Sequence, residues 1–165
     1  MENFESLIND ININKSYKIS YKDVKDYNIN FNYITENLAI YADKKFKELG
    51  INNMQLSYNK YTDLDVKEYI YYSVFIKINK VSYDLYDIFS GIELNKSILK
   101  NELSEKNMHD LIELYKLINN NKFIGKMLLL FYGINSLEKN ILIVKYNDFY
   151  SDFNNIIKKY INKVA

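Results

Sequence analysis

Cysteine, proline, tryptophan and arginine are all missing from this chain of 165 residues. Without cysteine there is no disulfide, no thiolate nucleophile and no sulfur ligand for zinc. His109 is the one histidine, so neither a catalytic triad nor a site built on several histidines can be assembled within one chain. We therefore expect no catalytic residues, no cofactor and a function other than catalysis.

Glycine is also scarce, with four residues spread along the chain: Gly50, Gly91, Gly125 and Gly133. Their spacing does not fit a phosphate-binding or dinucleotide-binding loop. Nothing rich in proline or glycine marks a linker, so residues 1–165 are predicted to form one domain. The longest apolar run, Met127 to Ile134, is too short to cross a membrane, and the start carries no apolar leader. The prediction is a soluble, cytoplasmic protein that makes no contact with membranes.

The charge is nearly balanced, because 22 lysines face 21 acidic residues and the net charge is +1. Nucleic-acid-binding domains usually have a clear basic excess and use arginine for paired contacts to guanine or phosphate. Neither feature is present, so we expect no nucleic-acid partner. The abundance of asparagine, isoleucine, lysine and tyrosine points to an AT-rich genome, such as that of a low-GC bacterium or its phages.

Hydrophobic spacing predicts an α+β fold. The expected elements, in chain order, are one or two short strands within Ile11–Phe31, a helix over Tyr33–Leu49, paired strands at Asn53–Tyr61 and Val66–Asn79, a short helix within Ser82–Lys100, a helix over Ser104–Asn119, paired strands at Lys126–Tyr132 and Ile141–Tyr146, and a helix over Asp148–Lys163. Hairpins without strand–helix–strand alternation favour an antiparallel or mixed sheet of about four to six strands, with about three main helices mostly on one face.

Three local features support or qualify these predictions. Asn32 is expected to cap the first long helix, and Gly50 to end it in the left-handed conformation. Ser104 is expected to cap the next one. The run Lys126–Tyr132 is apolar on every side, which fits a buried strand slightly better than a helix.

Tyrosine is unusually dense around the first predicted hairpin. Five tyrosines fall within fifteen residues: Tyr58, Tyr61, Tyr69, Tyr71 and Tyr72. Alternation puts Tyr71 and Phe75 on the face opposite Tyr72. Tyrosine offers a large contact area at low entropic cost, so Tyr61, Tyr69, Tyr71 and Phe75 are the candidate interface residues. The competing interpretation is that tyrosine is simply a good strand former in a tyrosine-rich chain.

Acidic residues offer one other candidate chemistry. Asp63 and Asp65, followed by Glu68, lie in the predicted hairpin loop and would suit a hard cation such as Mg²⁺ or Ca²⁺. The loop lacks the glycine and terminal glutamate of an EF-hand, and aspartate is itself a favoured turn former. The turn interpretation is therefore preferred, and no metal site is predicted.

The leading hypothesis is a non-catalytic protein-binding domain, monomeric or homodimeric. The order helix, hairpin, helix, hairpin resembles in outline that of several small bacterial immunity proteins, which bind and block a toxin, so an immunity protein is its most concrete form. One alternative is a small-molecule-binding or carboxylate-dependent enzyme domain, which a pocket of at least about 300 Å³ lined by acids would favour. Another is an accessory or structural protein of a phage or mobile element.

Overall fold

The computed structural model describes residues 2–12, 19, 21–63, 65, 69–90, 104–138, 141–144 and 150–164. In chain order the elements are α1 (Phe4–Asp10), α2 (Tyr21–Asp26), the 3-10 turn η1 (Phe31–Tyr33), α3 (Ile34–Glu48), β1 (Met54–Thr62), β2 (Ile70–Ile78), β3 (Val81–Asp84), α4 (Leu85–Phe89), α6 (Glu105–Asn120), α7 (Lys122–Gly133), β4 (Ile134–Glu138), β5 (Ile141–Val144) and α8 (Ser151–Val164). The predicted α+β class is confirmed. The described residues form seven α-helices, more than the three main helices and one short helix expected.

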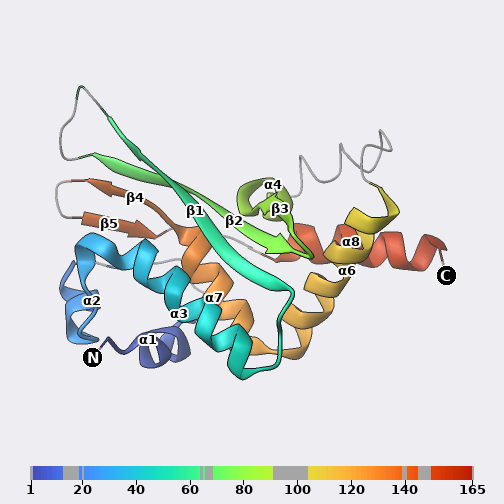
Figure 1. Cartoon of the computed structure of the whole chain (residues 1–165), viewed down its shortest axis with the longest axis horizontal. Coiled ribbons are helices and arrows are strands. Elements are labelled where there is room, and N and C mark those ends of the chain that lie inside the picture. Colours follow the sequence, from blue (N-terminus) through green and yellow to red (C-terminus); the bar gives the residue numbers. More distant parts are fainter. Residues whose placement is uncertain are drawn as a thin grey trace.

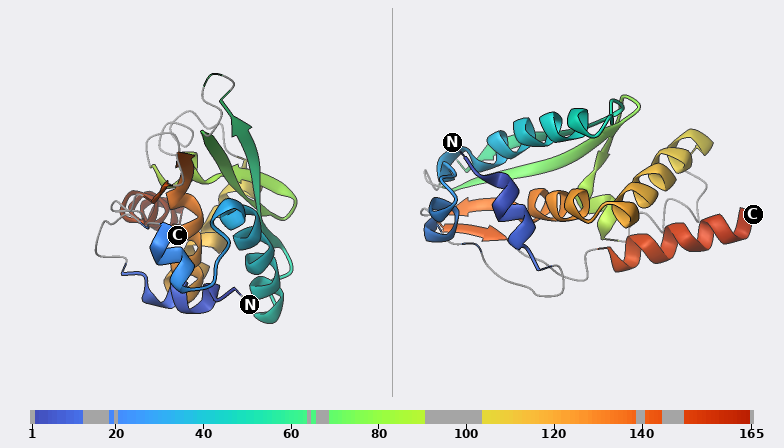
Figure 2. Two further views of the ribbon diagram at one scale, coloured as in Figure 1. Left: turned by 90° about the vertical axis from the view of Figure 1, so that its left-hand side faces the viewer. Right: turned by 90° about the horizontal axis from the view of Figure 1, so that it is seen from below.

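The strands form one antiparallel sheet in the order β1-β2-β4-β5, with β3 also paired to β2. Helices α1, α3 and α7 lie on one side of β1 and β2, whereas α6 and α8 extend past the end of the sheet (Figures 1 and 2). None of the helices within the described ranges is both long enough and apolar enough to cross a membrane.

The hairpin of β1 and β2 was predicted correctly. Its register runs without interruption from Met54 opposite Ile78 to Thr62 opposite Ile70. Val74, Ile76 and Ile78 are buried, which confirms the alternation read from the sequence. This apolar face lies over the helices and closes the core.

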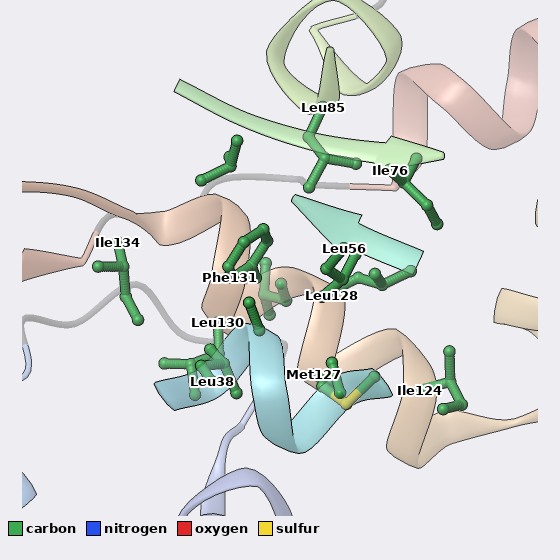
Figure 3. Packing of buried hydrophobic residues seen from close by; sticks show 14 of the residues in the cluster. Leu38, Leu56, Ile76, Leu85, Ile124, Met127, Leu128, Leu130, Phe131 and Ile134 are labelled. Carbon is green, nitrogen blue, oxygen red and sulfur yellow. The ribbon is translucent and has the colours of Figure 1, made fainter. Parts of the chain in front are cut away.

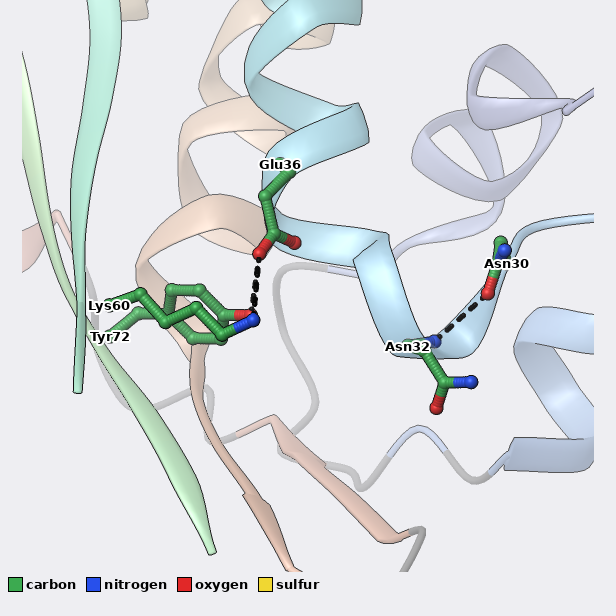
Figure 4. Close-up of polar contacts among 5 residues, drawn as sticks. All are labelled: Asn30, Asn32, Glu36, Lys60 and Tyr72. Atoms are coloured by element: carbon green, nitrogen blue, oxygen red, sulfur yellow. Dashed lines mark hydrogen bonds and ion pairs between the residues drawn. The ribbon is translucent and has the colours of Figure 1, made fainter. Parts of the chain in front are cut away.

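Helix α3 also matches its prediction, apart from its first turn. Asn32 does not cap α3: the residue at its N-cap is Tyr33, which makes no side-chain cap hydrogen bond. Asn30 instead caps the preceding 3-10 turn, where its Oδ1 accepts a hydrogen bond from the Asn32 backbone N–H (Figure 4). Gly50 adopts a φ of +75°, the left-handed conformation that ends the helix as predicted. Further on, the Ser104 side chain accepts a hydrogen bond from the Asn107 N–H and caps α6, also as predicted.

The prediction of strands within Ile11–Phe31 is wrong for the described part of that segment. Residues 21–26 form α2 and residues 31–33 form the 3-10 turn η1. Val24, Ile29 and Phe31 all reach the core, so their burial is satisfied by helical and turn conformations. Residues 13–18 and 20, where much of the alternation was read, lie outside the described residues.

The prediction of a strand at Lys126–Tyr132 is also wrong, since these residues lie within helix α7. Its start is capped by Asn121, whose side chain accepts a hydrogen bond from the Ile124 N–H. The helix is apolar on every side because α1, α3, α6, β4 and β5 all contact it. Figure 3 shows Met127, Leu128 and Phe131 of this helix among side chains from α3, β1 and β2. The hairpin expected here exists, but Ile134–Glu138 supplies its first strand.

The segment Ser82–Lys100 begins with strand β3 before the expected short helix. A two-residue turn joins β2 to β3, and both its residues, Asn79 and Lys80, have positive φ angles of 51° and 72°. Such a turn matches the twist of the flanking strands. Helix α4 then follows, capped by Asp84. The rest of the segment, residues 91–100, lies outside the described residues.

Candidate functional site

The candidate interface tyrosines meet at the loop end of the β1–β2 hairpin. Tyr61 stands directly opposite Tyr71 in the register, and their rings stack with centroids 5.2 Å apart. The Tyr69 ring lies 5.8 Å from that of Tyr71. Tyr61 and Tyr71 are each 40% exposed, and Tyr69 is half-buried. We call Tyr61, Tyr69 and Tyr71 the tyrosine cluster.

Two structural features expose the tyrosine cluster. Strand alternation turns Tyr61 and Tyr71 away from the face that carries Leu56 and Ile76, which is buried. In addition, the loop end of the hairpin projects beyond helices α1 and α3 (Figure 1). The cluster therefore combines apolar ring area with hydroxyl groups on a protruding part of the molecule.

Phe75 does not join the tyrosine cluster. It lies on the same face as Tyr71, four residues and so about 13 Å further along β2. It is partly buried where β2 pairs with β3, opposite Asp84. The structure thus brings together three of the four candidate residues.

The aspartates of the hairpin loop are engaged in the turn itself. The Asp63 side chain accepts a hydrogen bond of 2.9 Å from the backbone N–H of Asp65. The Asp63 N–H in turn donates to the Tyr69 carbonyl at 3.1 Å. This geometry is that of a turn-forming aspartate. Glu68, the other acid of the loop, lies outside the described residues.

A buried polar network, which the sequence did not predict, joins the β2–β3 turn to helix α6. Asp110 is 1% exposed, and its two oxygens accept hydrogen bonds from Tyr83 Oη and Asn79 Nδ2, each at 2.7 Å. Asn53 Nδ2 donates to Asn79 Oδ1 at 3.2 Å and to Glu113 Oε1 at 2.8 Å. Burial raises the pKa of Tyr83 well above its usual value of 10.0, and the hydrogen bond to Asp110 and its charge raise it further.

His109 is exposed on α6, as expected for a polar residue at the edge of an apolar stripe. Ligand atoms of His109, Asp110 and Glu113 lie within 4.8 Å of one another, a spacing that a metal ion would require. However, both Asp110 oxygens and Glu113 Oε1 already accept hydrogen bonds. The two acidic residues of this group therefore belong to the polar network.

A second polar contact ties the hairpin to α3. The Tyr72 hydroxyl donates to Glu36 Oε1 at 2.9 Å, and Lys60 Nζ lies 3.7 Å from the same oxygen (Figure 4). Burial raises the pKa of Tyr72 well above 10.0, and the hydrogen bond to Glu36 adds to the shift. Tyr72 is thus a structural tyrosine, whereas its neighbour Tyr71 is exposed.

Two hollows lined by described residues are relevant to the alternative of a small-molecule site. One, of about 390 Å³, lies beside α1 and α2 and is lined by Asp10, Asp23 and Asp26 together with Leu7, Ile19 and Tyr27. The Tyr27 hydroxyl donates to Asp10 Oδ2 at 2.7 Å. The other, of about 760 Å³, lies where α3 ends and β1 begins, and its charged lining residues are Asp43, Lys47, Lys77 and Lys80.

Comparison of the chain with protein-family models, curated proteins and solved structures finds no match.

Proposed function

We propose that this protein is a non-catalytic protein-binding domain whose partner docks on the tyrosine cluster. The observation that supports this is the stacking of Tyr61 and Tyr71, both 40% exposed, on a projecting hairpin. Grouped exposed aromatics are uncommon on monomeric surfaces unless something binds them. The stack also holds the rings in place before binding, so less side-chain entropy is lost on association.

In its most concrete form the proposal is a bacterial immunity protein that neutralises a cognate toxin. The net charge of +1 gives little long-range attraction to a basic partner, so a basic nuclease is disfavoured as the toxin. Recognition would instead depend on aromatic contact area at the cluster. The outline order of helices and hairpins noted in the sequence supports this form only as a likeness of fold, and fold does not determine function.

The test compares wild-type protein with Tyr71→Ala as affinity bait, followed by calorimetry with the purified partner. An anchor residue contributes about 2 kcal/mol or more, so Tyr71→Ala should weaken binding about thirtyfold while the melting temperature stays close to that of the wild type. Asn59→Ala is the matched control, because Asn59 is exposed on the same face of β1 as Tyr61. Equal binding by Tyr71→Ala and wild type would place the interface elsewhere.

The immunity form has its own test. The product of a neighbouring gene should inhibit bacterial growth when expressed alone, and co-expression of this chain should restore growth. Tyr71→Ala should restore it less well. A neighbouring gene whose product is not toxic would contradict the immunity form. The more general proposal of protein binding would then still be tested by calorimetry.

The hollow lined by Asp10, Asp23 and Asp26 favours a second candidate function, a carboxylate site for a cationic small molecule. Such a ligand would raise the melting temperature by binding the folded state. Spermidine is a suitable probe, and Asp26→Asn should reduce the rise. No rise with spermidine would contradict this candidate.

A further inference from the structure

Within the described residues, the outer edge of β1 carries a regular row of unpaired backbone groups. At its two ends, Asp63 N–H donates to the Tyr69 carbonyl, and Asn79 N–H donates to the Asn53 carbonyl. In an antiparallel pair, alternate residues exchange hydrogen bonds with the neighbouring strand. The odd-numbered residues of β1 therefore bond to β2. The N–H and C=O groups of the even-numbered residues point away from β2: Met54, Leu56, Tyr58, Lys60 and Thr62. No other described strand pairs with β1.

This edge has few of the features by which proteins protect a free strand. Such features include proline, bulges, short strands and outward charge. β1 is nine residues long, its register with β2 shows no irregularity, and its single charged residue is Lys60. Lys60 lies 3.7 Å from Glu36, so its charge is partly balanced within the chain.

Helix α3 runs beside β1 and adds an exposed apolar side chain. Ile40 is 71% exposed, the most exposed of the large hydrophobic residues within the described ranges. It lies four residues after Glu36 and three before Asp43, and residues at these spacings share one side of a helix. Glu36 contacts Lys60 of β1, and Asp43 lines the hollow at the start of β1. Ile40 is therefore on the side of α3 that borders the β1 edge.

Ile40 is also level with the middle of the strand. Four residues of helix place Ile40 about 6 Å from Glu36 along α3. Two residues of strand place Tyr58 about 7 Å from Lys60 along β1, in the same direction, since α3 and β1 are antiparallel neighbours. Tyr58 is the central residue of β1. The midpoint of the unpaired edge and the exposed isoleucine thus lie side by side.

We propose that a second copy of this chain docks on the β1 edge, with the two β1 strands antiparallel about a two-fold axis through Tyr58. A two-fold interface brings the same patch of each copy together, so Ile40 meets Ile40 of the other copy. Lys60 then stands opposite Leu56, and no like charges face each other across the strands. Asp43 and Lys47, which flank the interface, are paired within each copy at 3.1 Å.

The proposal is independent of the tyrosine cluster as a binding site. Antiparallel pairing continues the sheet from one copy into the other and keeps the same faces aligned. Both tyrosine clusters then lie on one continuous face, opposite the two α3 helices. A partner with two copies of its own site would bind such a dimer more tightly than a monomer.

Sedimentation equilibrium from about 1 µM to about 1 mM tests the proposal, with wild type expected to change from monomer to dimer. Ile40→Glu should raise the dissociation constant by at least about tenfold, because it puts two like charges at the axis. Tyr86→Glu is the matched control, since Tyr86 is 61% exposed on α4 and far from β1 in the chain. The Tyr86→Glu and Tyr71→Ala variants should both dimerise like the wild type.

Hydrogen exchange of the wild type provides a second readout that needs no variant. The outward amides of Leu56, Tyr58 and Lys60 should exchange more slowly as the protein concentration rises, whereas those of Ser57 and Asn59 should not change. A monomer throughout the range, or a dimer unaffected by Ile40→Glu whose outward amides stay unprotected, would overturn the proposal.

Discussion

Tyrosine serves two opposite purposes in this molecule. Tyr61 and Tyr71 stack at the end of the hairpin with their rings partly exposed to solvent. Tyr72 and Tyr83 are buried, and each donates its hydroxyl to a carboxylate, Glu36 or Asp110. Tyr71 and Tyr72 are neighbours in sequence, so their difference comes from strand alternation. Tyrosine abundance alone is therefore uninformative, and the face on which each residue lies decides its role.

The largest effect should be on the free energy of unfolding, which should fall far more when a buried tyrosine is replaced than when a tyrosine of the cluster is replaced. Tyr83→Ala should lower the free energy of unfolding by about 3–5 kcal/mol, because it opens a cavity and leaves Asp110 without its hydroxyl donor. Tyr71→Ala should lower it by less than about 1 kcal/mol. Urea unfolding followed by circular dichroism measures both. Similar losses would mean that the tyrosine cluster is part of the core.

Alkaline pH should destabilise the fold through tyrosines whose pKa is raised in the folded state, among them Tyr72 and Tyr83. The folded state keeps the protons of Tyr72 and Tyr83 above pH 10.0, whereas the unfolded state releases them. The stabilisation from these tyrosines is therefore fully present below about pH 10. Above about pH 10, the free energy of unfolding should fall by about 1.4 kcal/mol per pH unit for each of them. Tyr83→Phe should reduce that slope. Unfolding in urea at several alkaline pH values checks this, and an unchanged slope in Tyr83→Phe would contradict it.

Removing single hydroxyl groups should give a smaller contrast. Tyr72→Phe deletes the donor to Glu36 and should cost about 1–2 kcal/mol, since a buried acceptor is left with fewer partners. Tyr61→Phe should stay within about 0.5 kcal/mol of the wild type. Thermal unfolding of both variants measures the difference. A loss in Tyr61→Phe as large as that in Tyr72→Phe would remove the distinction.

The smallest effects are expected from divalent cations and from loss of the His109 side chain. Millimolar Mg²⁺ or Ca²⁺ should not shift the melting temperature, because Asp63 is engaged in its turn and Asp110 in its network. His109→Ala should change the equilibrium constants for unfolding and for partner binding by no more than about twofold. A rise in melting temperature with either cation, lost in Asp65→Asn, would restore a metal site at the hairpin loop.

The sequence predicted those elements whose two faces differ in polarity. β2 alternates cleanly, and α3 and α6 carry apolar stripes with cap residues nearby, so each was identified. Periodicity gave no such guide at Lys126–Tyr132, because a helix contacted on all sides is apolar all round. In the N-terminal segment, apolar residues at alternate positions suggested strands, although helix α2 and the 3-10 turn bury Val24 and Phe31 equally well.

The candidate site was predictable to the extent that it depends on a single hairpin. Alternation and loop length were enough to place Tyr61, Tyr69 and Tyr71 together. The network of Asp110 was not predictable, because it joins Tyr83 to a residue 27 positions later across a segment of ambiguous pattern. Asn79 and Lys80, lying between alternating strands, carried the one usable signal, that of a two-residue turn.

The position of α7 has a consequence for how the chain folds during synthesis. Helices α1 and α3 contact α7, and Lys126 Nζ donates to the Asn9 carbonyl 117 residues earlier. Helix α1 is therefore made long before its main packing partner, α7, leaves the ribosome. Contacts so distant in sequence slow folding, since a long loop must close before they form. Until α7 emerges, Leu7, Ile8 and Leu38 stay open to water, so a nascent chain stalled before residue 122 should depend on chaperones to stay soluble.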